Sequence, residues 1–383
     1  MYNPEMERIP CVIMRGGTSK GIFLLENDLP SDAKTRDRVI LSIFGSPDSR
    51  QIDGLGGADP LTSKLAIIGR SSRTDADINY TFGQVELHSA YVDYSSNCGN
   101  ISSAVGPFAI AQGLVKAVEP ITSVRIYNTN TDKVFEAEVP VVDGKPAVLG
   151  DYKIHGVPGT GARIGVNLAG TVGAKTGSLL PTGNPTDFID VPGFGSLEVS
   201  MVDAASPMVF VRASDLGLVG TEGPQEIDSD PKMLKLLEDI RATAAVTMGI
   251  APDIETAHEK IRAVPMVAFI SPAAEYKSHI NGEPISAKAI DFVSRGMFMG
   301  IMHKTYSGTA TVCTGCAAVT KGTLVNQLMP PIGGDTVVRI GHPGGIIECD
   351  MTVNNGVITR AIFGRTARRI MEGYVYIPRK ILN

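Results

Sequence analysis

The feature that most constrains the fold of this chain is an internal repeat. A glycine-spaced pattern, G-x-x-[ST]-x-x-x-G-x-x-A-x-x-x-G, begins at Gly99 and begins again at Gly308. A second match, without a gap, pairs "MRGGTSKGIFLLENDL" (residues 14–29) with "MVDAASPMVFVRASDL" (residues 201–216). Two matches in the same order along the chain indicate a duplication.

The duplication predicts two pseudo-symmetric lobes. The N-terminal lobe is expected to cover residues 1–185 and to carry Lys64 and Cys98. The C-terminal lobe is expected to cover residues 186–383 and to carry Ser307, with the last residues free to pack back on the first lobe. At 383 residues the chain is long enough for two hydrophobic cores.

Strand-like runs of alternating apolar and polar residues recur along the chain, and turn signals separate them. The run "MTVNNGVITR" predicts a hairpin with Asn355 and Gly356 at its turn. Helices are fewer, and the regular strand–helix alternation of a doubly wound fold is absent, so the pattern predicts an α+β fold. Helices are expected over residues 33–43, 102–112, 230–247, 285–299 and 311–320.

Composition narrows the class of function. The net charge is −5 and no basic run is interleaved with aromatic residues, which argues against a nucleic-acid partner. No apolar stretch approaches the roughly 18 residues that span a bilayer. Five scattered cysteines do not suggest a disulfide framework, so a cytoplasmic location is expected. The sequence is compatible with a homo-oligomer.

The repeat places Cys98 opposite Ser307, each just before a glycine at a helix start. The first amides of a helix have no acceptor within the helix, and the dipole there is positive. Two such helix starts facing one cleft would bind an anion, and the same field favours the thiolate of Cys98. Gly99 and Gly308 would let a ligand approach the backbone, while Asn97, Asn100 and Thr309 would add polar contacts. The alternative is a small capping residue whose thiol does nothing.

Two glycine-rich loops offer further polar groups. The loop before "TSKLAII" ends at Lys64, where an apolar strand begins, so the amine would lose solvation there. Lys64 is either a base or carboxylate partner, or a surface lysine. The loop "MRGGTSKG" lacks the P-loop pattern but would offer Arg15, Thr18 and Ser19 to a carboxylate. The alternative for this loop is a plain hairpin.

The motif "CTGC" (residues 313–316) suggests zinc or redox chemistry, but no second pair of Cys or His completes a tetrahedral site. We interpret Cys313 and Cys316 as buried small hydrophobic residues within a helix. His303 and His342 are interpreted as structural. With no metal cluster, dinucleotide motif or P-loop, the expected protein is an enzyme without a cofactor.

Four segments, "RGGTSKG", "GSPDSRQIDGLGGADPLTSK", "NCGNISSAVGPFA" and "SGTA…GTLVN", together resemble the PrpF-type isomerases. This family includes 2-methylaconitate cis-trans isomerase, 3-methylitaconate Δ-isomerase and 4-oxalomesaconate tautomerase. The resemblance runs from about Arg8 to about Tyr376. It implies the diaminopimelate epimerase-like fold, in which each lobe has a mixed sheet curled around a central helix.

The resemblance also implies the chemistry. Ser307 stands where diaminopimelate epimerase has its second cysteine, which argues against a two-cysteine racemisation, and the family instead pairs Cys98 with Lys64. The implied reaction moves a proton and a double bond within a small unsaturated di- or tricarboxylate, and 3-methylitaconate to 2,3-dimethylmaleate is the favoured case. Methylaconitate or aconitate isomerisation and the oxalomesaconate tautomerase are alternatives, and a dicarboxylate-binding module is the non-enzymatic one. The residues expected to bind the substrate are Arg15, Thr18, Ser19, Asn97, Gly99, Asn100, Ser307, Gly308 and Thr309.

Overall fold

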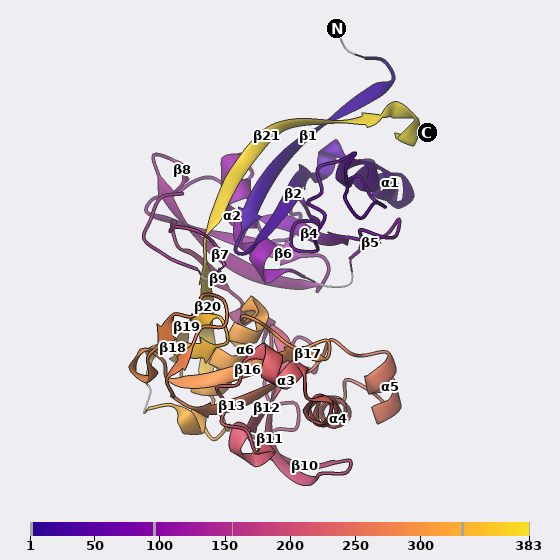
Figure 1. The fold of residues 1–383 in the computed structure, drawn as a ribbon. Helices are drawn as coiled ribbons and strands as arrows, with labels where there is room; N and C mark the ends of the chain where they lie inside the picture. Colours follow the sequence, from indigo (N-terminus) through magenta and orange to yellow (C-terminus); the bar gives the residue numbers. More distant parts are fainter. Residues whose placement is uncertain (1–2, 95–96, 155, 331–332, 383) are drawn as a thin grey trace. The chain divides into compact units, whose positions relative to one another are not determined.

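The computed structural model describes residues 3–94, 97–154, 156–330 and 333–382 of the chain. The chain forms two compact units, shown in Figure 1, and each is described here by itself. The first unit contains residues 1–166 and 364–383, and the second contains residues 167–363. No helix among the described residues has the length and apolar character needed to cross a membrane.

The boundary between the units differs from the expected one at residues 185 and 186. Residues 167–185 belong to the second unit because they are tied to its strands. The amide of Gly173 donates to Asp203 O at 2.8 Å, and the amide of Asp203 donates to Leu179 O at 2.9 Å. The Asp203 carboxylate also accepts from the amides of Lys175 and Thr176.

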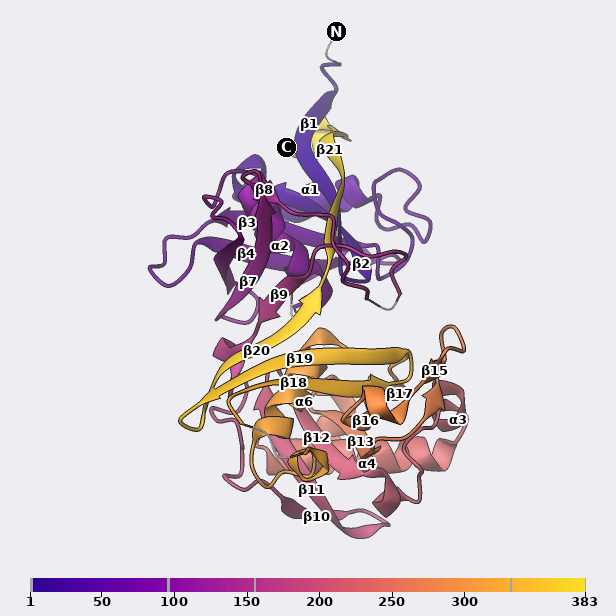
Figure 2. The same cartoon turned by 90° about the vertical axis from the view of Figure 1, so that its left-hand side faces the viewer.

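The first unit is built around one mixed sheet. Its strands pair in the order β21-β1-β2-β3-β4-β6-β7, and the last strand of the chain lies antiparallel along the whole length of β1, as Figures 1 and 2 both show. The elements are β1 (Met6–Gly16), β2 (Ser19–Leu25), α1 (Ala33–Phe44), β3 (Lys64–Arg70), β4 (Ile78–Val85), β5 (Val92–Asp93), α2 (Gly99–Ala111), β6 (Ile121–Asn128), β7 (Lys133–Val142), β8 (Lys145–Pro146), β9 (Ile164–Asn167) and β21 (Ala367–Pro378).

The second unit repeats this plan with additional helices. Its strands pair in the order β10-β11-β12-β13-β16-β18-β19-β20. The elements are β10 (Asp187–Val191), β11 (Gly195–Ala204), β12 (Ser206–Arg212), α3 (Pro224–Asp228), α4 (Pro231–Thr247), α5 (Ile254–Glu259), β13 (Met266–Pro272), β14 (Tyr276–Lys277), β15 (Pro284–Ile285), β16 (Phe292–Phe298), β17 (Ile301–Met302), α6 (Gly308–Val319), β18 (Asp335–His342), β19 (Gly345–Asn354) and β20 (Val357–Arg365).

The duplication is visible in the pattern of strand pairing. From β1 to β7 the successive pairs run antiparallel, parallel, antiparallel, parallel and antiparallel, and the series from β11 to β19 is the same. The second parallel pair of each series, β4–β6 and β16–β18, carries the same ion pair, with partners 48 residues apart: Asp77 with Arg125 at 2.7 Å and Asp291 with Arg339 at 2.6 Å. The expected α+β class and the duplicated architecture are confirmed.

A nearly all-apolar helix lies within each sheet. Almost every residue of α2 and α6 is buried, which is typical of a helix enclosed on all sides. The matched repeat glycines explain the close approach: a Cβ at Gly106 would lie 2.8 Å from Val139 Cγ2, and one at Gly315 would lie 2.8 Å from Cys349 Sγ. Figure 2 shows α6 among the strands of its unit. On the opposite face of the sheets, α1 packs in the first unit and α4 in the second.

One predicted helix is wrong. The segment expected to be helical over residues 285–299 forms the short strand β15, a 3-10 turn and the strand β16. Residues 292–297 are all buried, and β16 lies between β13 and β18, so strand pairing on both sides overrides the helical spacing of the sequence. The other four predicted helices form with shifts of a few residues, and the Asn355–Gly356 hairpin turn is confirmed between β19 and β20.

Candidate functional site

The β1–β2 hairpin lies against the first turn of α2. A Cβ at Gly16 would approach Asn100 O to 2.4 Å, and one at Gly17, where φ is +51°, would approach Asn100 Oδ1 to 2.1 Å. Thr18 N donates to Asn100 Oδ1 at 3.3 Å, and Asn100 Nδ2 donates to Thr18 Oγ1 at 3.0 Å. The two glycines therefore permit this close contact, which brings two predicted binding segments together.

Cys98 is the N-cap residue of α2. Every residue of this helix lies within the described part of the chain, and the Cys98 thiol makes no hydrogen bond that caps it. The side chain of the preceding residue also lies at this helix start, because Asn97 Oδ1 accepts from Cys98 N at 2.7 Å and from Ser102 Oγ at 3.2 Å. The first bond within the helix runs from Ser102 N to Cys98 O. The thiol is half-buried, and so it is not committed to holding the helix start.

Lys64 is buried, with 8% of its surface exposed, so the alternative of a surface lysine is wrong. Its neighbours Leu65 and Ile67 pack in the core on the α1 side, and strand alternation therefore turns Lys64 to the α2 side. Lys64 Nζ donates to Gln84 Oε1 at 2.7 Å and lies 5.3 Å from the centre of the Phe82 ring. The Lys64 amine is thus held by a hydrogen bond to an uncharged amide oxygen.

The start of β3 and the first turn of α2 meet at the same end of the sheet. A Cβ at Gly21 would lie 2.8 Å from Lys64 O and 3.0 Å from Ile101 Cδ1, so Ile101 packs beside the Lys64 backbone. Ile101 is three residues after Cys98. The amine and the thiol therefore approach this end from a strand and from a helix of the same unit.

Ser19 faces the same end. Its neighbour on the α2 side of the sheet, Gly21, contacts Ile101, and its cross-strand partner Gly16 contacts Asn100. Ser19 is buried, and its hydroxyl has no hydrogen-bond partner among the described residues. A buried polar group of this kind needs a partner, so it is suited to accept or donate a bond to a ligand.

The Arg15 side chain, which is expected to bind a substrate carboxylate, makes hydrogen bonds to backbone carbonyls. Its Nη1 donates to Gly17 O at 2.9 Å and to Thr366 O at 2.8 Å, which braces the hairpin against the chain entering β21. Burial, and next the charge of Arg368, lower the pKa of Arg15. A role for Arg15 in substrate binding stays a prediction.

Three residues near this end were not predicted from the sequence: Gln84, Tyr80 and Arg365. Gln84 holds Lys64 and also donates from Nε2 to Ser63 O at 3.0 Å. Burial, and next the charge of Cys98, raise the pKa of Tyr80 well above its usual value. The sequence signal that could have indicated such residues is a polar side chain inside an otherwise apolar strand, as with Gln84 in "TFGQVEL".

The predicted residues of the second unit lie at the start of α6, and Ser307 caps it. Ser307 Oγ accepts from Ala310 N at 3.1 Å and lies 3.3 Å from Thr309 Oγ1, so this hydroxyl does hold its helix start. Gly308 is buried, and a Cβ there would approach the Phe363 ring to 2.5 Å. The need for glycine at this position thus has a packing cause within the unit.

The second unit carries no amine equivalent to Lys64. In the first unit Gly21 pairs with Lys64, and in the second Met208, which the repeat matches to Gly21, pairs with Met266. Met266 is buried. The two units have therefore diverged: one presents a lysine and a thiol, and the other a serine at the equivalent helix start.

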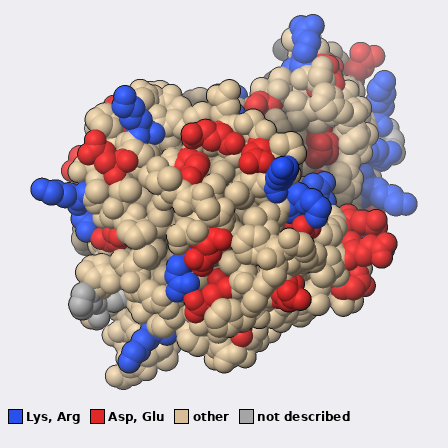
Figure 3. Space-filling view, turned by 60° about the horizontal axis from the view of Figure 1, so that its bottom comes forward, with Lys and Arg blue, Asp and Glu red and all other residues tan. Residues whose placement is uncertain are grey.

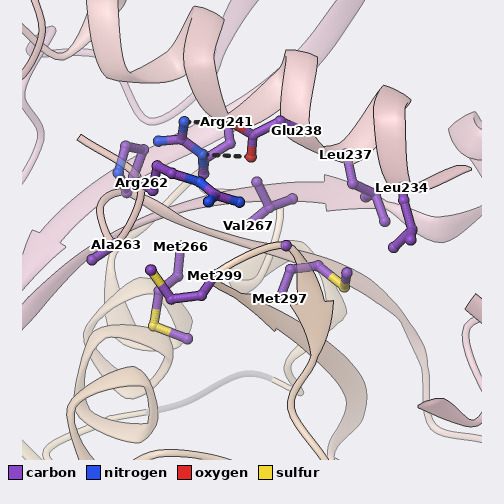
Figure 4. A pocket seen from close by; sticks show the side chains of 12 residues that line it. Leu234, Leu237, Glu238, Arg241, Arg262, Ala263, Met266, Val267, Met297 and Met299 are labelled. Carbon is purple, nitrogen blue, oxygen red and sulfur yellow. Dashed lines mark hydrogen bonds and ion pairs between the residues drawn. The ribbon is translucent and has the colours of Figure 1, made fainter. Parts of the chain in front are cut away.

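A pocket in the second unit lies apart from all of these residues (Figure 4). Its walls come from α4, the chain before β13, and the end of β16, and three methionines line it: Met266, Met297 and Met299. On the α4 side, Arg241 donates to both carboxylate oxygens of Glu238, at 2.8 and 2.6 Å. None of the predicted site residues lines this pocket.

The other four cysteines are buried. Cys313 Sγ donates to Val202 O at 3.3 Å, and burial raises the pKa values of both Cys313 and Cys316, the latter to about 12. The interpretation of "CTGC" as buried packing residues is confirmed. Within the described part of the chain, no cluster of three or more His, Cys, Asp or Glu side chains is arranged to hold a metal. On the face in Figure 3, basic and acidic side chains are interspersed on a largely uncharged surface.

Comparison with known proteins gives a consistent result. The family model described as "PrpF protein" matches residues 6–378. A 3-methylitaconate isomerase of Eubacterium barkeri is 55% identical over 375 residues, which is 98% of each chain. A 2-methyl-aconitate isomerase of Shewanella oneidensis is 39% identical, over 98% of each chain. The crystal structure of a methylitaconate-delta-isomerase matches with a TM-score of 0.95 at 54% identity, covering 99% of this chain and 98% of that one.

Proposed function

Because the chain belongs to the PrpF family, we propose that it is an isomerase that interconverts 3-methylitaconate and 2,3-dimethylmaleate. The observation that carries this proposal is the 55% identity to a 3-methylitaconate isomerase along almost the whole of both chains. The relative named for 2-methyl-aconitate is 39% identical over a similar span, so that acid is the second candidate. A 4-oxalomesaconate tautomerase of Pseudomonas putida, also 39% identical, is the third.

The reaction needs one group to take a proton and another to return one. In 3-methylitaconate the proton lost stands on the carbon α to a carboxylate, and the proton gained goes to the methylene carbon at the far end of the allyl system. The double bond moves between these two events, and no atom is lost. Lys64 and Cys98 are the two groups proposed for these transfers, in either order. A well-placed base and acid of this kind contribute about 10²–10⁴-fold.

Removing that proton places a second negative charge beside an existing carboxylate. The positive start of α2, with the amides that precede its first internal bond, is suited to stabilise the developing charge. The unpartnered Ser19 hydroxyl lies at the same helix start. Preorganised donors of this type are worth several kcal/mol in a site shielded from water.

A deuterium experiment tests the proposal. The protein is incubated with 3-methylitaconate in deuterium oxide and followed by proton NMR. We expect 2,3-dimethylmaleate to form with deuterium in a new methyl group. Tight binding with neither conversion nor deuterium in the acid would overturn the enzyme and favour the dicarboxylate-binding module. Faster turnover of 2-methylaconitate in a parallel assay would move the assignment to the second candidate.

Two further expectations from the sequence, one about a cofactor and one about location, form part of this proposal. We propose that the enzyme acts without a cofactor, on the basis of the two-residue acid–base pair. We also propose a cytoplasmic location, which the five free thiols support.

A further inference from the structure

The loop that precedes β3 is held by one buried side chain. Residues 45–63, all of them described, join α1 to β3 and contain no helix or strand. Gln51 lies in this loop with 2% of its surface exposed. Its Nε2 donates to Ser46 Oγ at 2.9 Å and to Ser63 Oγ at 2.8 Å, and its Oε1 accepts from Ala58 N at 2.9 Å. One amide group thus joins the beginning, the later part and the end of the loop.

The backbone of Gln51 also indicates that its side chain matters. Its φ is +45°, a left-handed conformation that residues with a side chain rarely adopt. A Cβ at Gly56 would approach Gln51 Oε1 to 2.1 Å, so only a glycine at that position leaves room for the amide. A glycine at position 51 would adopt the same φ without strain but would offer none of the three hydrogen bonds. The position therefore favours the amide group over a more relaxed backbone.

Ser63 connects Gln51 to the strand β4. Ser63 is fully buried, and its hydroxyl accepts from Gln51 and donates to Val85 O at 2.8 Å. The Ser63 carbonyl accepts from Gln84 Nε2 at 3.0 Å, and Pro60 O accepts from the same nitrogen at 3.1 Å. The Gln84 amide nitrogen is thereby directed at two loop carbonyls, so its oxygen is left for another donor.

The Gln84 oxygen accepts from the Lys64 amine at 2.7 Å. This bond completes a series of hydrogen bonds that begins at Gln51 and continues through Ser63. We propose that Gln51 is a positioning residue, which fixes the Lys64 amine by way of this series. The use of the amine in proton transfer rests on the proposed function, but its placement by the loop does not.

The kinetic test separates kcat from KM. Gln51→Met keeps an unbranched side chain of similar length and removes all three hydrogen bonds, whereas Ser63→Ala removes a single hydroxyl. Each variant should lower kcat for 3-methylitaconate about tenfold, because a small misplacement of a reacting group slows proton transfer. KM should stay within about threefold, because the lost interaction acts on the transition state and not on binding.

Thr122 provides a matched control. It is buried in the same unit, at the start of β6, and its hydroxyl donates to Val118 O and accepts from Val118 N, both at 2.8 Å. Thr122→Val and Ser63→Ala therefore each remove one donated and one accepted bond. Both should lose a similar amount of stability in urea unfolding, and only Ser63→Ala should lose kcat. An equal loss of kcat in Thr122→Val would overturn the proposal.

Paired variants test the series of bonds. If Gln51 acts through Ser63, adding Gln51→Met to Ser63→Ala should lower kcat by less than about twofold more, whereas independent effects would multiply. If the series continues through Gln84, adding Gln51→Met to Gln84→Leu should likewise change kcat little. Multiplied losses in either pair would overturn the proposal.

Acetylation of Lys64 measures its placement without any turnover. In the reaction with acetic anhydride the amine attacks one carbonyl, acetate leaves and a proton passes to water. Peptide mass spectrometry gives the rate at Lys64 relative to the rate at the exposed Lys145. Lys64 is buried and hydrogen-bonded, so we expect Gln51→Met to raise this ratio about fivefold by loosening the loop. Thr122→Val should leave the ratio unchanged.

The two proposals fail in different ways. If the wild-type protein does not convert 3-methylitaconate but Gln51→Met raises the labelling ratio, the positioning of the amine stands and the proposed activity falls. If the wild-type protein converts the acid and neither kcat nor the ratio changes in Gln51→Met, the activity stands and the role of Gln51 falls. If Gln51→Met does not fold, Ser63→Ala decides, and wild-type values of kcat and of the ratio there overturn the proposal.

Discussion

At the scale of single residues, the surroundings of the five thiols decide their chemistry. Cys98 stands half-buried before α2, and the side chain of its neighbour Asn97 accepts a hydrogen bond from the Cys98 amide. Cys313 lies inside α6, donates to Val202 O, and has its pKa raised by burial. The first thiol is accessible to a ligand and to base, whereas the second is fixed in the core.

Cys98→Ser should lose most turnover and still bind dicarboxylates. A serine hydroxyl is a far weaker acid than a thiol, so kcat should fall about 10²–10⁴-fold. The measurements are kcat with 3-methylitaconate and the affinity for a dicarboxylate inhibitor. Cys313→Ala is the matched control, and its kcat should stay within a few-fold of wild type. Near wild-type turnover in Cys98→Ser would remove Cys98 from the mechanism.

Gln84→Leu should lower kcat about tenfold or more with little change in dicarboxylate affinity. Gln84 holds Lys64 Nζ at 2.7 Å, and a misplaced amine loses the geometry on which proton transfer depends. Because Gln84 acts through Lys64, the pH dependence of kcat should also shift, which a purely structural role would not cause. An unchanged pH profile with an unchanged kcat would show that Lys64 needs no such support.

The sequence identified residues that stand in local patterns and missed those that do not. Cys98, Lys64 and Ser19 each lie in a glycine-rich loop beside an apolar run, which marks a helix or strand start. Arg365 meets Asn100 across 265 positions of the chain, and no local spacing encodes a contact of that length. A long-range contact of this kind is fixed only by the path of β20 and β21.

At the scale of elements, the parallel pairs β4–β6 and β16–β18 are held together by equivalent ion pairs. In the first unit, Asp77 accepts from the Arg125 side chain and backbone amide, and these bonds join the chain before β4 to β6. In the second, Asp291 joins the chain before β16 to β18 in the same way. The helix predicted over residues 285–299 is wrong because β16 pairs antiparallel with β13 and parallel with β18, and local spacing does not reveal these partners.

Asp77→Asn should destabilise the first unit in a pH-dependent way. The hydrogen bonds from Arg125 lower the pKa of Asp77 below its unfolded value, so their contribution is present at neutral pH and is lost as the pH falls through the folded-state pKa. We expect a loss of about 1–2 kcal/mol at pH 7. Urea unfolding across pH measures it.

The difference between wild type and Asp77→Asn should shrink below about pH 4, where an ordinary aspartate is protonated. The control is Asp75→Asn, which removes an exposed ion pair with Arg73 and should change stability little at any pH. A constant difference down to pH 2 would show that the Asp77 charge does not matter.

At the scale of the whole molecule, the duplication was readable from the sequence and the exact division was not. Matched glycines predicted two similar units because each must let a sheet approach its central helix. The boundary was misplaced because residues 167–185 have no repeat partner and are held by Asp203 of the second unit. The unit to which such a connecting segment belongs is determined by its tertiary hydrogen bonds.

Removing residues 367–383 should damage the first unit and spare the second. β21 pairs with β1 from Met6 to Gly16, so a chain ending at Thr366 leaves β1 with an open edge. Hydrogen exchange should speed up in β1 and α2 and remain slow in β13 and α4. Equal loss of protection in both units would show that they do not unfold separately.

The second unit is thus inserted in the first, since the chain leaves the first unit after Val166 and returns at Gly364. During synthesis on the ribosome, every residue of the second unit emerges before β21, so this unit is free to fold while the first still lacks a strand. The thiol and the amine both lie in the unit that is finished last. A nascent chain would therefore complete this unit only after β21 has emerged, and until then the unpaired side of β1 would be the place for a chaperone to shield.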